Sequence, residues 1–366
     1  MRADGDSWSL RFPGFDGFIS NDPMWLQKGG RLLFLSNKNG AGGHLWTVDP
    51  AGSSEALHIP QVAGSLGDGV RLPALSKAGH HLAFTKLSED ENIWRVDLTG
   101  NSAGRLKKLI GSTRQEKYPQ YSPDVRFIAF ESDRSGFPEI WVAQADGTHE
   151  FALTNFRGPV TGSPSWSPDG KQIAFDTRAS VQPQVFVMNV EAGSKPRQIT
   201  HGPGDNVLPC WSADGQFIYF NSARTGDSRI WKISAAGGTA EQVTTHFSFD
   251  PQVSPDGKTL YFMTGRGENS EIHRLDLSSR DEERVVSSAR DRSFSPTNRG
   301  VYYLQRITAT SQFLRFWNSQ TKQDTVITRI EGRSYSGLSA SQDNRLVLLV
   351  KDDAGGMDLM LVDDFK

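Results

Sequence analysis

The chain has 366 residues, a formal net charge of −2 and a single cysteine. The charge excludes the global basic bias that non-specific nucleic-acid binding requires, so we expect no nucleic-acid partner for this chain. One cysteine excludes an internal disulfide, and we expect Cys210 to be a small buried apolar residue. The 36 glycines and 18 prolines stand at turns rather than in tracts, which argues against disorder.

The N-terminal residues 1–13 are charged and lack the apolar core of a secretory signal. No run of residues approaches the roughly 18 consecutive apolar positions of a membrane-spanning helix. We therefore predict a chain without a membrane segment, cytoplasmic as it stands. If the chain is a fragment of a longer membrane-anchored protein, the prediction changes to the periplasm.

Residues 163–200 are the clearest copy of an internal repeat. Four short runs alternate apolar with polar residues and are bounded by Pro, Gly, Asp or Ser, which is typical of half-buried antiparallel strands. The turn Ser167-Pro168-Asp169-Gly170 joins the first two runs, and its last residue must adopt the left-handed conformation. Glycine does so without cost, and asparagine is the next best residue.

The other copies are aligned on this turn and give eight units, spaced by about 41 to 50 residues, as is typical of propeller blades. Val125 is the misfit among the turn residues, because a β-branched residue at this position either strains the turn or forces another turn type. The aligned turn positions are Gly29, Gly79, Val125, Gly170, Gly215, Gly257, Asn298 and Asn344.

In chain order, a strand-like run at residues 7–12 precedes the first unit. The first unit follows with strands at 23–26, 31–37, 44–49 and 55–59, and the second with 71–76, 81–85, 92–97 and 106–110. The last unit has strands at 335–338, 346–350 and 358–362 and no fourth.

We therefore expect the run at 7–12 to complete the last blade and remove two exposed sheet edges. The predicted fold is all-β: an eight-bladed propeller of four-stranded antiparallel blades in a single domain, 1–366. Tryptophans that recur once per unit are expected to fill the space between blades.

The SPDG turn, the I-A-F second strand, the D-R-S-G loop at 133–136, the I-W third strand and the closing Leu153-Thr154 resemble TolB-type, WD40-like β-propeller repeats. More closely, residues 92–97, 111–114, 119–122 and 358–362 resemble the C-terminal propellers of bacterial CadC-like winged-helix regulators. This second resemblance implies a sensor or interaction module. The chain departs from those regulators in having no winged helix.

A basic residue follows the end of each second strand, in the loops that share one face with the connections between blades. If these side chains point inward, they form a positive collar that binds a carboxylate, a phosphate or an acidic protein tail. The alternative is that each cation braces its own loop by pairing with an acid such as Asp133, Asp176 or Asp227. The collar residues are Lys38, Lys86, Arg134, Arg178, Arg224, Arg266, Arg306 and Lys351.

Enzymatic motifs are weak in this sequence. The G-x-S-x-G elbow of serine hydrolases is absent, and the eight histidines include no H-E-x-x-H. Two pairs in the blade connections, His201 with Asp205 and His246 with Asp250, are candidates for a ligand, a metal or acid–base chemistry. We predict no catalytic residue, no metal site and no cofactor, and we count His201 and His246 among the ligand-binding candidates.

The sequence favours a non-catalytic propeller that binds a protein segment or a small anionic ligand on its loop-rich face. The alternative is a propeller-type hydrolase or lyase acting on a sugar or a peptide. A third reading is a fragment of a longer bacterial regulator, in which this chain is the sensor.

Overall fold

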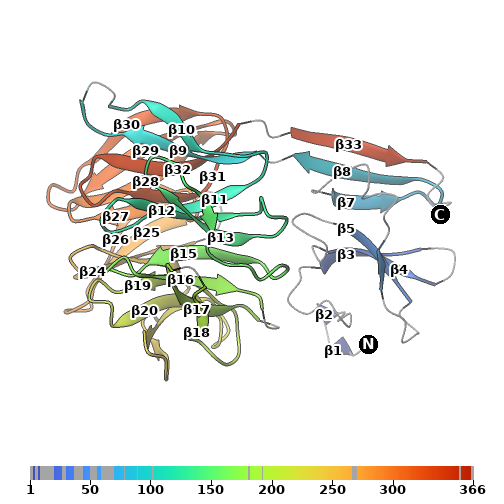
Figure 1. Ribbon diagram of the computed structural model, residues 1–366, viewed down its shortest axis with the longest axis horizontal. Coiled ribbons are helices and arrows are strands. Elements are labelled where there is room, and N and C mark those ends of the chain that lie inside the picture. The colour runs from blue at the N-terminus through green and yellow to red at the C-terminus, as the bar shows by residue number, and fades with distance from the viewer. Residues whose placement is uncertain are drawn as a thin grey trace. The chain divides into compact units, whose positions relative to one another are not determined.

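The computed structural model describes an all-β chain (Figure 1), with no α-helix among its described residues. In that part of the chain, no helix is long and apolar enough to cross a membrane. The chain divides into two compact units, one of residues 1–89, 157–160 and 354–366 and one of 90–156 and 161–353. The described residues are 3–4, 7–8, 20–26, 30–36, 44–49, 56–58, 70–77, 79–88, 90–100, 103–179, 182–191, 193–265, 270–353 and 356–363.

The described part of the second unit contains six four-stranded antiparallel sheets. Five of them are built from consecutive strands, as the repeat predicts. These are β11 (Glu116–Tyr121), β12 (Phe127–Ser132), β13 (Glu139–Gln144) and β14 (Phe151–Ala152); β15 (Thr161–Trp166), β16 (Gln172–Thr177), β17 (Gln184–Asn189) and β18 (Arg197–Gln198); β19 (Asn206–Trp211), β20 (Phe217–Ser222), β21 (Arg229–Ser234) and β22 (Glu241–Gln242); β23 (Phe249–Val253), β24 (Thr259–Thr264), β25 (Ser270–Asp276) and β26 (Glu282–Ala289); and β27 (Phe294–Thr297), β28 (Gly300–Thr308), β29 (Ser311–Asn318) and β30 (Asp324–Glu331).

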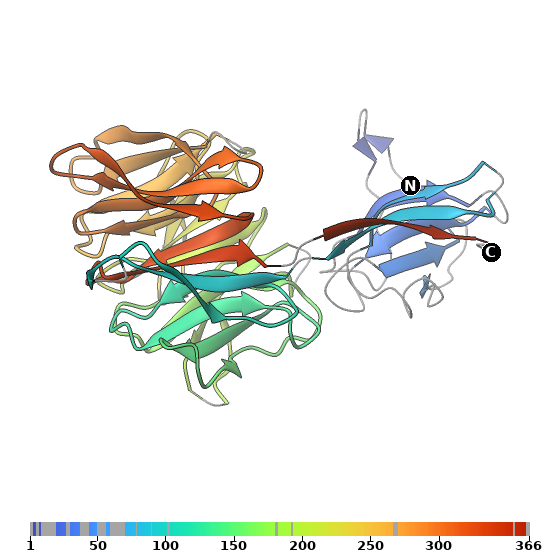
Figure 2. The ribbon, with the colours of Figure 1, turned by 90° about the horizontal axis from the view of Figure 1, so that it is seen from above.

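The sixth sheet combines strands that lie far apart in the sequence. Its order is β10 (Leu106–Ile110), β9 (Glu91–Asp97), β32 (Leu346–Asp352) and β31 (Ser334–Ala340), with Leu346 opposite Asp97 in the central pair. Figure 2 shows the cyan pair beside the red pair. The first strands contact one another in the order β11, β15, β19, β23, β27 and β31, and β31 contacts β11. The sheets are therefore the blades of a propeller whose contacts run round a ring.

This topology differs from the predicted closure. The eight-blade count and completion of the last blade by residues 7–12 are not confirmed. Ser7–Trp8 (β2) pairs with Ala3–Asp4 (β1), and residues 9–12 lie outside the described residues. The physical reason is that both sides of β32 are already occupied by hydrogen-bonded neighbours, β31 on one side and β9 on the other.

The turn between the first two strands of a blade has the predicted chemistry. The Ser167 hydroxyl donates to Asp169 Oδ1 over 2.6 Å and accepts from the Gln172 backbone N–H at 2.9 Å. Gly170 has φ +69° and Val125 has φ +58°, so Val125 occupies the left-handed position and does not force another turn type.

One turn assignment stays a prediction and another is corrected. In the first unit Gly30 has positive φ, at +61°, and the predicted Gly29 lies outside the described residues. In the seventh unit Thr297 pairs directly with Gly300, which leaves a two-residue turn. Asn298 in that turn does not adopt positive φ, and in this hairpin positive φ falls on Gly300, at +149°.

The core lies between neighbouring sheets rather than within them. One cluster joins Ala129 and Val142 of one blade to Ile173 and Phe175 of the next. Trp166 is 6% exposed in the same cluster, and its indole N–H donates to the Gln120 carbonyl of the preceding blade over 3.1 Å. This tryptophan therefore has the predicted packing role. Full burial of one such side chain stabilises the fold by about 1.5–3 kcal/mol.

The first unit contains the remaining described strands. A four-stranded sheet contains β3 (Ser20–Trp25), β4 (Leu32–Ser36), β5 (His44–Val48) and β6 (Leu57–His58), as predicted for the first repeat. A three-stranded sheet has the order β33 (Gly356–Val362), β8 (Leu82–Ser88) and β7 (Val70–Leu75). The predicted second and eighth repeats are thus each divided between two sheets.

Candidate functional site

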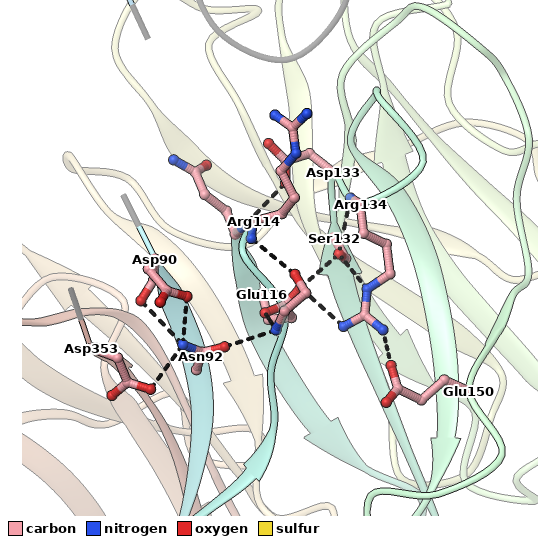
Figure 3. A network of polar contacts seen from close by, with 11 residues as sticks. Asp90, Asn92, Arg114, Glu116, Ser132, Asp133, Arg134, Glu150 and Asp353 are labelled. Atoms are coloured by element: carbon pink, nitrogen blue, oxygen red, sulfur yellow. Dashed lines mark hydrogen bonds and ion pairs between the residues drawn. The ribbon is translucent and has the colours of Figure 1, made fainter. Parts of the chain in front are cut away.

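Arg134, a predicted collar residue, braces its own blade. Its guanidinium lies between Glu116, which is fully buried, and Glu150, and bonds to both carboxylates (Figure 3). The Nη2–Glu116 Oε1 distance is 3.0 Å, and Nε donates to the Ser132 hydroxyl over 3.1 Å. The predicted alternative of a brace therefore describes this residue. Asp133, which we proposed as the partner, accepts instead from the Gln115 backbone N–H at 2.9 Å.

Arg224 occupies the same place two blades further on. Nη2 donates to Asn206 Oδ1 over 2.7 Å and Nε to the Ser222 hydroxyl over 3.0 Å. The guanidinium carbon stands 4.7 Å from the ring centroid of Trp231. Burial lowers the pKa of Arg224. In both blades the partner lies 18 residues before the arginine, a spacing in the sequence that identifies the brace.

The other cations of the predicted collar differ in their contacts. Arg178 approaches Asp205 at 3.6 Å and has a side chain that is 37% exposed. Lys351 lies over the Trp94 ring at 4.6 Å and 3.4 Å from Asp353 Oδ1. Arg306 Nε donates to the Thr308 carbonyl at 2.9 Å. Lys38 and Arg266 lie outside the described residues, and Lys86 belongs to the first unit.

The histidines have partners other than the predicted ones. His246 Nε2 lies 3.3 Å from Glu282 Oε1, which also contacts His273 Nδ1 at 2.9 Å. His201 Nδ1 lies 3.2 Å from Gln198 Nε2. Among the described residues, no group of three or more His, Cys, Asp or Glu side chains has a geometry that could hold a metal ion.

The propeller axis has a feature that the sequence analysis did not interpret. In four consecutive blades the first strand contains an X-Pro pair at which the strand register shifts. Proline donates no ladder hydrogen bond, so the pairing breaks there and the backbone bulges. The residues before these prolines all have positive φ: Tyr118 at +49°, Ser163 at +56°, Leu208 at +56° and Asp250 at +54°. Backbone strain of this kind clusters at functional sites.

Arg292, from the connection before β27, also has positive φ, at +52°, and lines the axial cavity beside these bulges. Nη1 donates to the Tyr118 hydroxyl over 2.8 Å and Nη2 to the Ser163 hydroxyl over 3.1 Å. The guanidinium carbon lies 3.8 Å from the centre of the Tyr118 ring. One arginine thus ties two other blades together at the axis.

Three carboxyl groups surround this arginine electrostatically. Burial raises the pKa of Glu131 to about 7, against the opposing charges of Lys117 and Arg292. Burial likewise raises the pKa of Asp250 to about 6, against Arg292. The pKa of Asp176 is also raised by burial, although its Oδ1 accepts the Leu208 N–H at 3.0 Å. Glu131 and Asp250 therefore titrate closer to neutral pH than exposed acids do, and the pKa of Asp176 is shifted in the same direction.

Two charged atoms at the axis have no hydrogen-bond partner among the described residues, Asp250 Oδ2 and Arg292 Nε, and both are buried. Leaving such a group unsatisfied costs about 1–3 kcal/mol or more, so a polar ligand or water is expected there. The cavity that both residues line has a volume of about 60 Å³. Cys210 lines it too, and burial raises its thiol pKa to about 12, so the thiol stays protonated and non-nucleophilic.

Comparison with known proteins supports the architecture. A family model described as "TolB beta propeller domain" matches residues 147–337, more than half of the chain. Crystalline TolB from Acinetobacter baumannii aligns at 17% identity and a TM-score of 0.55, over 93% of this chain and 81% of that one. A chain from a nidogen–laminin complex aligns at 9% identity and a TM-score of 0.55, over 70% of this chain and 97% of that one. At these identities the likeness is one of fold.

Proposed function

Because this chain belongs to the TolB β-propeller domain family, we propose that it is a non-catalytic binding module that recognises an extended segment of a partner protein over the axial cavity. The observation that carries the proposal is the pair of unsatisfied charged atoms, Asp250 Oδ2 and Arg292 Nε, at that cavity. A propeller suits this task because its scaffold is rigid and binding orders little of it.

The size of the cavity argues for a protein segment. Pockets for drug-sized ligands have volumes of about 300–1,000 Å³, whereas this one has about 60 Å³. Such a space holds a few water molecules or the tip of one side chain. A specific ligand must therefore lie mostly outside the cavity and insert a single polar group.

The two unsatisfied atoms define that group. Arg292 Nε donates a hydrogen bond, and the Asp250 carboxylate accepts one. An inserted side chain must therefore accept from one and donate to the other, as Asn, Gln, Ser or Thr does. We propose that the bound segment presents one of these residues to the axis.

The test uses a random peptide display library selected on the intact protein. We expect enriched peptides to contain a polar, uncharged residue and to bind an Asp250→Asn variant about tenfold or more weakly, the loss of one charge-assisted hydrogen bond. Asparagine tolerates the positive φ at this position, so the fold is preserved. Asp227→Asn, an equal charge change in an exposed loop, is the matched control.

Two outcomes contradict the proposal: no enrichment of any peptide, or equal binding by the Asp250→Asn variant and the wild type. Mass spectrometry of the bound peptides adds a second readout. Peptides recovered intact agree with a binding module, whereas cleaved peptides favour the hydrolase alternative.

The resemblance to CadC-like regulators supports a narrower proposal, namely that the binding module is the sensor part of a bacterial regulatory system. It rests on the sequence motifs alone. Within the predicted collar, we propose Arg178 as a further contact for the bound segment, because its side chain is 37% exposed and its carboxylate partner lies 3.6 Å away. Arg134 and Arg224 are engaged as braces.

A further inference from the structure

A second pocket lies where the connections before and after the β27–β30 blade meet the β28–β29 loop. Its volume is about 250 Å³, which suits a ligand smaller than drug-sized molecules. Three arginines line it, and none of the lining residues is acidic. The lining consists of Arg290, Arg306, Thr308, Ala309, Ser311, Gln312, Gly332, Arg333 and Ser334.

The fold brings these residues together from three segments. Arg306 and Gln312 stand directly opposite each other at the end of the β28–β29 hairpin. Arg290 lies in the connection before β27, where its N–H donates to the Leu304 carbonyl over 2.8 Å. Arg333 comes from the connection after β30, which is held to the hairpin where Gly332 N–H donates to a backbone carbonyl over 2.8 Å.

Two buried donors of the pocket have no hydrogen-bond partner among the described residues: Gln312 Nε2 and the Ser334 hydroxyl. Each residue is only 3% exposed, so bulk water does not satisfy them. Buried polar groups without partners are rare, and each calls for an explanation such as a bound ligand. An amide NH₂ and a hydroxyl next to three guanidinium groups are all hydrogen-bond donors, the complement of an oxyanion.

Two acidic residues that adjoin the pocket lining in the sequence have partners outside it. Asp291 accepts a hydrogen bond from the Ser270 hydroxyl, and Glu331 Oε1 lies 2.7 Å from Arg329 Nε. Asp353 bonds Asn92 at 2.9 Å and Lys108 at 2.9 Å. Lys351 adds a fourth cation at the border, since its Nζ lies 3.4 Å from the point where a side-chain carbon on Gly332 would stand.

We propose that this pocket binds a small ligand through a carboxylate or phosphate group. Arg306 and Arg333 supply forked donors to the anion, while Gln312 and Ser334 satisfy its remaining lone pairs. The site goes beyond the protein-segment function proposed for the axial cavity and does not depend on it.

Isothermal titration calorimetry at low ionic strength, with inorganic phosphate and separately with succinate, tests this site. We expect one of the two to bind with a Kd of about 1 mM or tighter. Binding of phosphate alone identifies a phosphate ligand, and binding of succinate alone a carboxylate. Arg333→Ala should weaken the binding about tenfold or more, since it removes a charged donor. Added salt should also weaken it.

Arg329→Ala is the matched control, because it removes the same charge from an exposed residue of β30 that does not line the pocket. It should change the Kd less than about twofold. Gln312→Glu, of nearly the same shape, puts a negative charge into the pocket and should abolish binding even if Arg333→Ala fails to fold. The proposal is overturned if neither anion binds at about 10 mM, if the control loses as much affinity as Arg333→Ala, or if Gln312→Glu still binds.

Discussion

At the residue scale, Glu131 makes the stability of the propeller depend on pH. Its ordinary pKa is 4.5, and burial raises it to about 7 in the folded protein. Between these values the folded state binds more protons than the unfolded state, so the free energy of unfolding falls as pH rises. The loss is complete above the folded pKa and absent below the unfolded one. Ionised Glu131 therefore destabilises the folded protein at neutral and alkaline pH.

We predict that Glu131→Gln raises the free energy of unfolding at pH 8 by on the order of 1–3 kcal/mol. At pH 4.5, where the carboxyl is protonated in the folded protein, wild type and variant should be nearly equal. Urea denaturation at both pH values measures the difference, and Glu241→Gln, an exposed position, should show no such dependence. A variant that is less stable at pH 8 would mean that the Glu131 charge is held favourably by Lys117 and Arg292.

At the element scale, the two braces differ in one respect that has a measurable consequence. Arg134 pairs with a buried carboxylate, whereas Arg224 in the equivalent place pairs with the neutral amide of Asn206. Removing Arg134 leaves Glu116 buried without its counter-charge, held only by hydrogen bonds from Ser112 and Ser132, which costs about 3–5 kcal/mol. Removing Arg224 leaves only an unsatisfied amide, which costs about 1–3 kcal/mol.

We predict that Arg134→Ala is the more destabilising change in guanidinium denaturation. Adding Glu116→Gln to Arg134→Ala should recover part of the loss, because it removes the buried charge. Equal losses from the two alanine variants, or no recovery, would show that the aromatic contacts rather than the charges determine stability here.

These braces also show how much of the site can be predicted from the sequence. The position of the arginine in each loop follows from the repeat, and so does the existence of a brace. The partner of each arginine does not follow from the repeat. We expected an acid next to the arginine in the sequence, whereas the hairpin brings a residue of the first strand, 18 residues earlier, beside it. The axial arginine was missed for a different reason. Arg292 occupies the position at which four other blades have the residue before proline. From the sequence alone, this blade therefore looks like a less well preserved copy of the repeat. The role of Arg292 is visible only once the bulges are seen to converge on the axis.

At the scale of the whole molecule, the strands and their turns were predictable and their pairing was not. Short apolar runs bounded by turn residues identify β9 and β32 as strands. They do not say which distant strand each one pairs with, since every such strand fits many partners. Counting repeats therefore gave eight blades, whereas the second and eighth repeats are divided, with β9 and β10 joining β31 and β32.

This pairing predicts how the chain responds to truncation. A fragment of residues 90–353 retains all six sheets of the second unit, together with residues 157–160, which are assigned to the first unit. We expect it to unfold cooperatively with a melting temperature close to that of the propeller in the full chain. A fragment of residues 112–353 lacks β9 and β10, which exposes the edge of β32 and leaves its blade with two strands. It should melt at a much lower temperature or fail to fold.

Differential scanning calorimetry of both fragments and the full chain measures these melting temperatures. If fragment 90–353 does not fold, the strands of residues 1–89 are needed for the propeller, and the chain is one domain as the repeat count predicts. If both fragments fold equally well, the β9–β32 pairing does not contribute to the stability of the propeller.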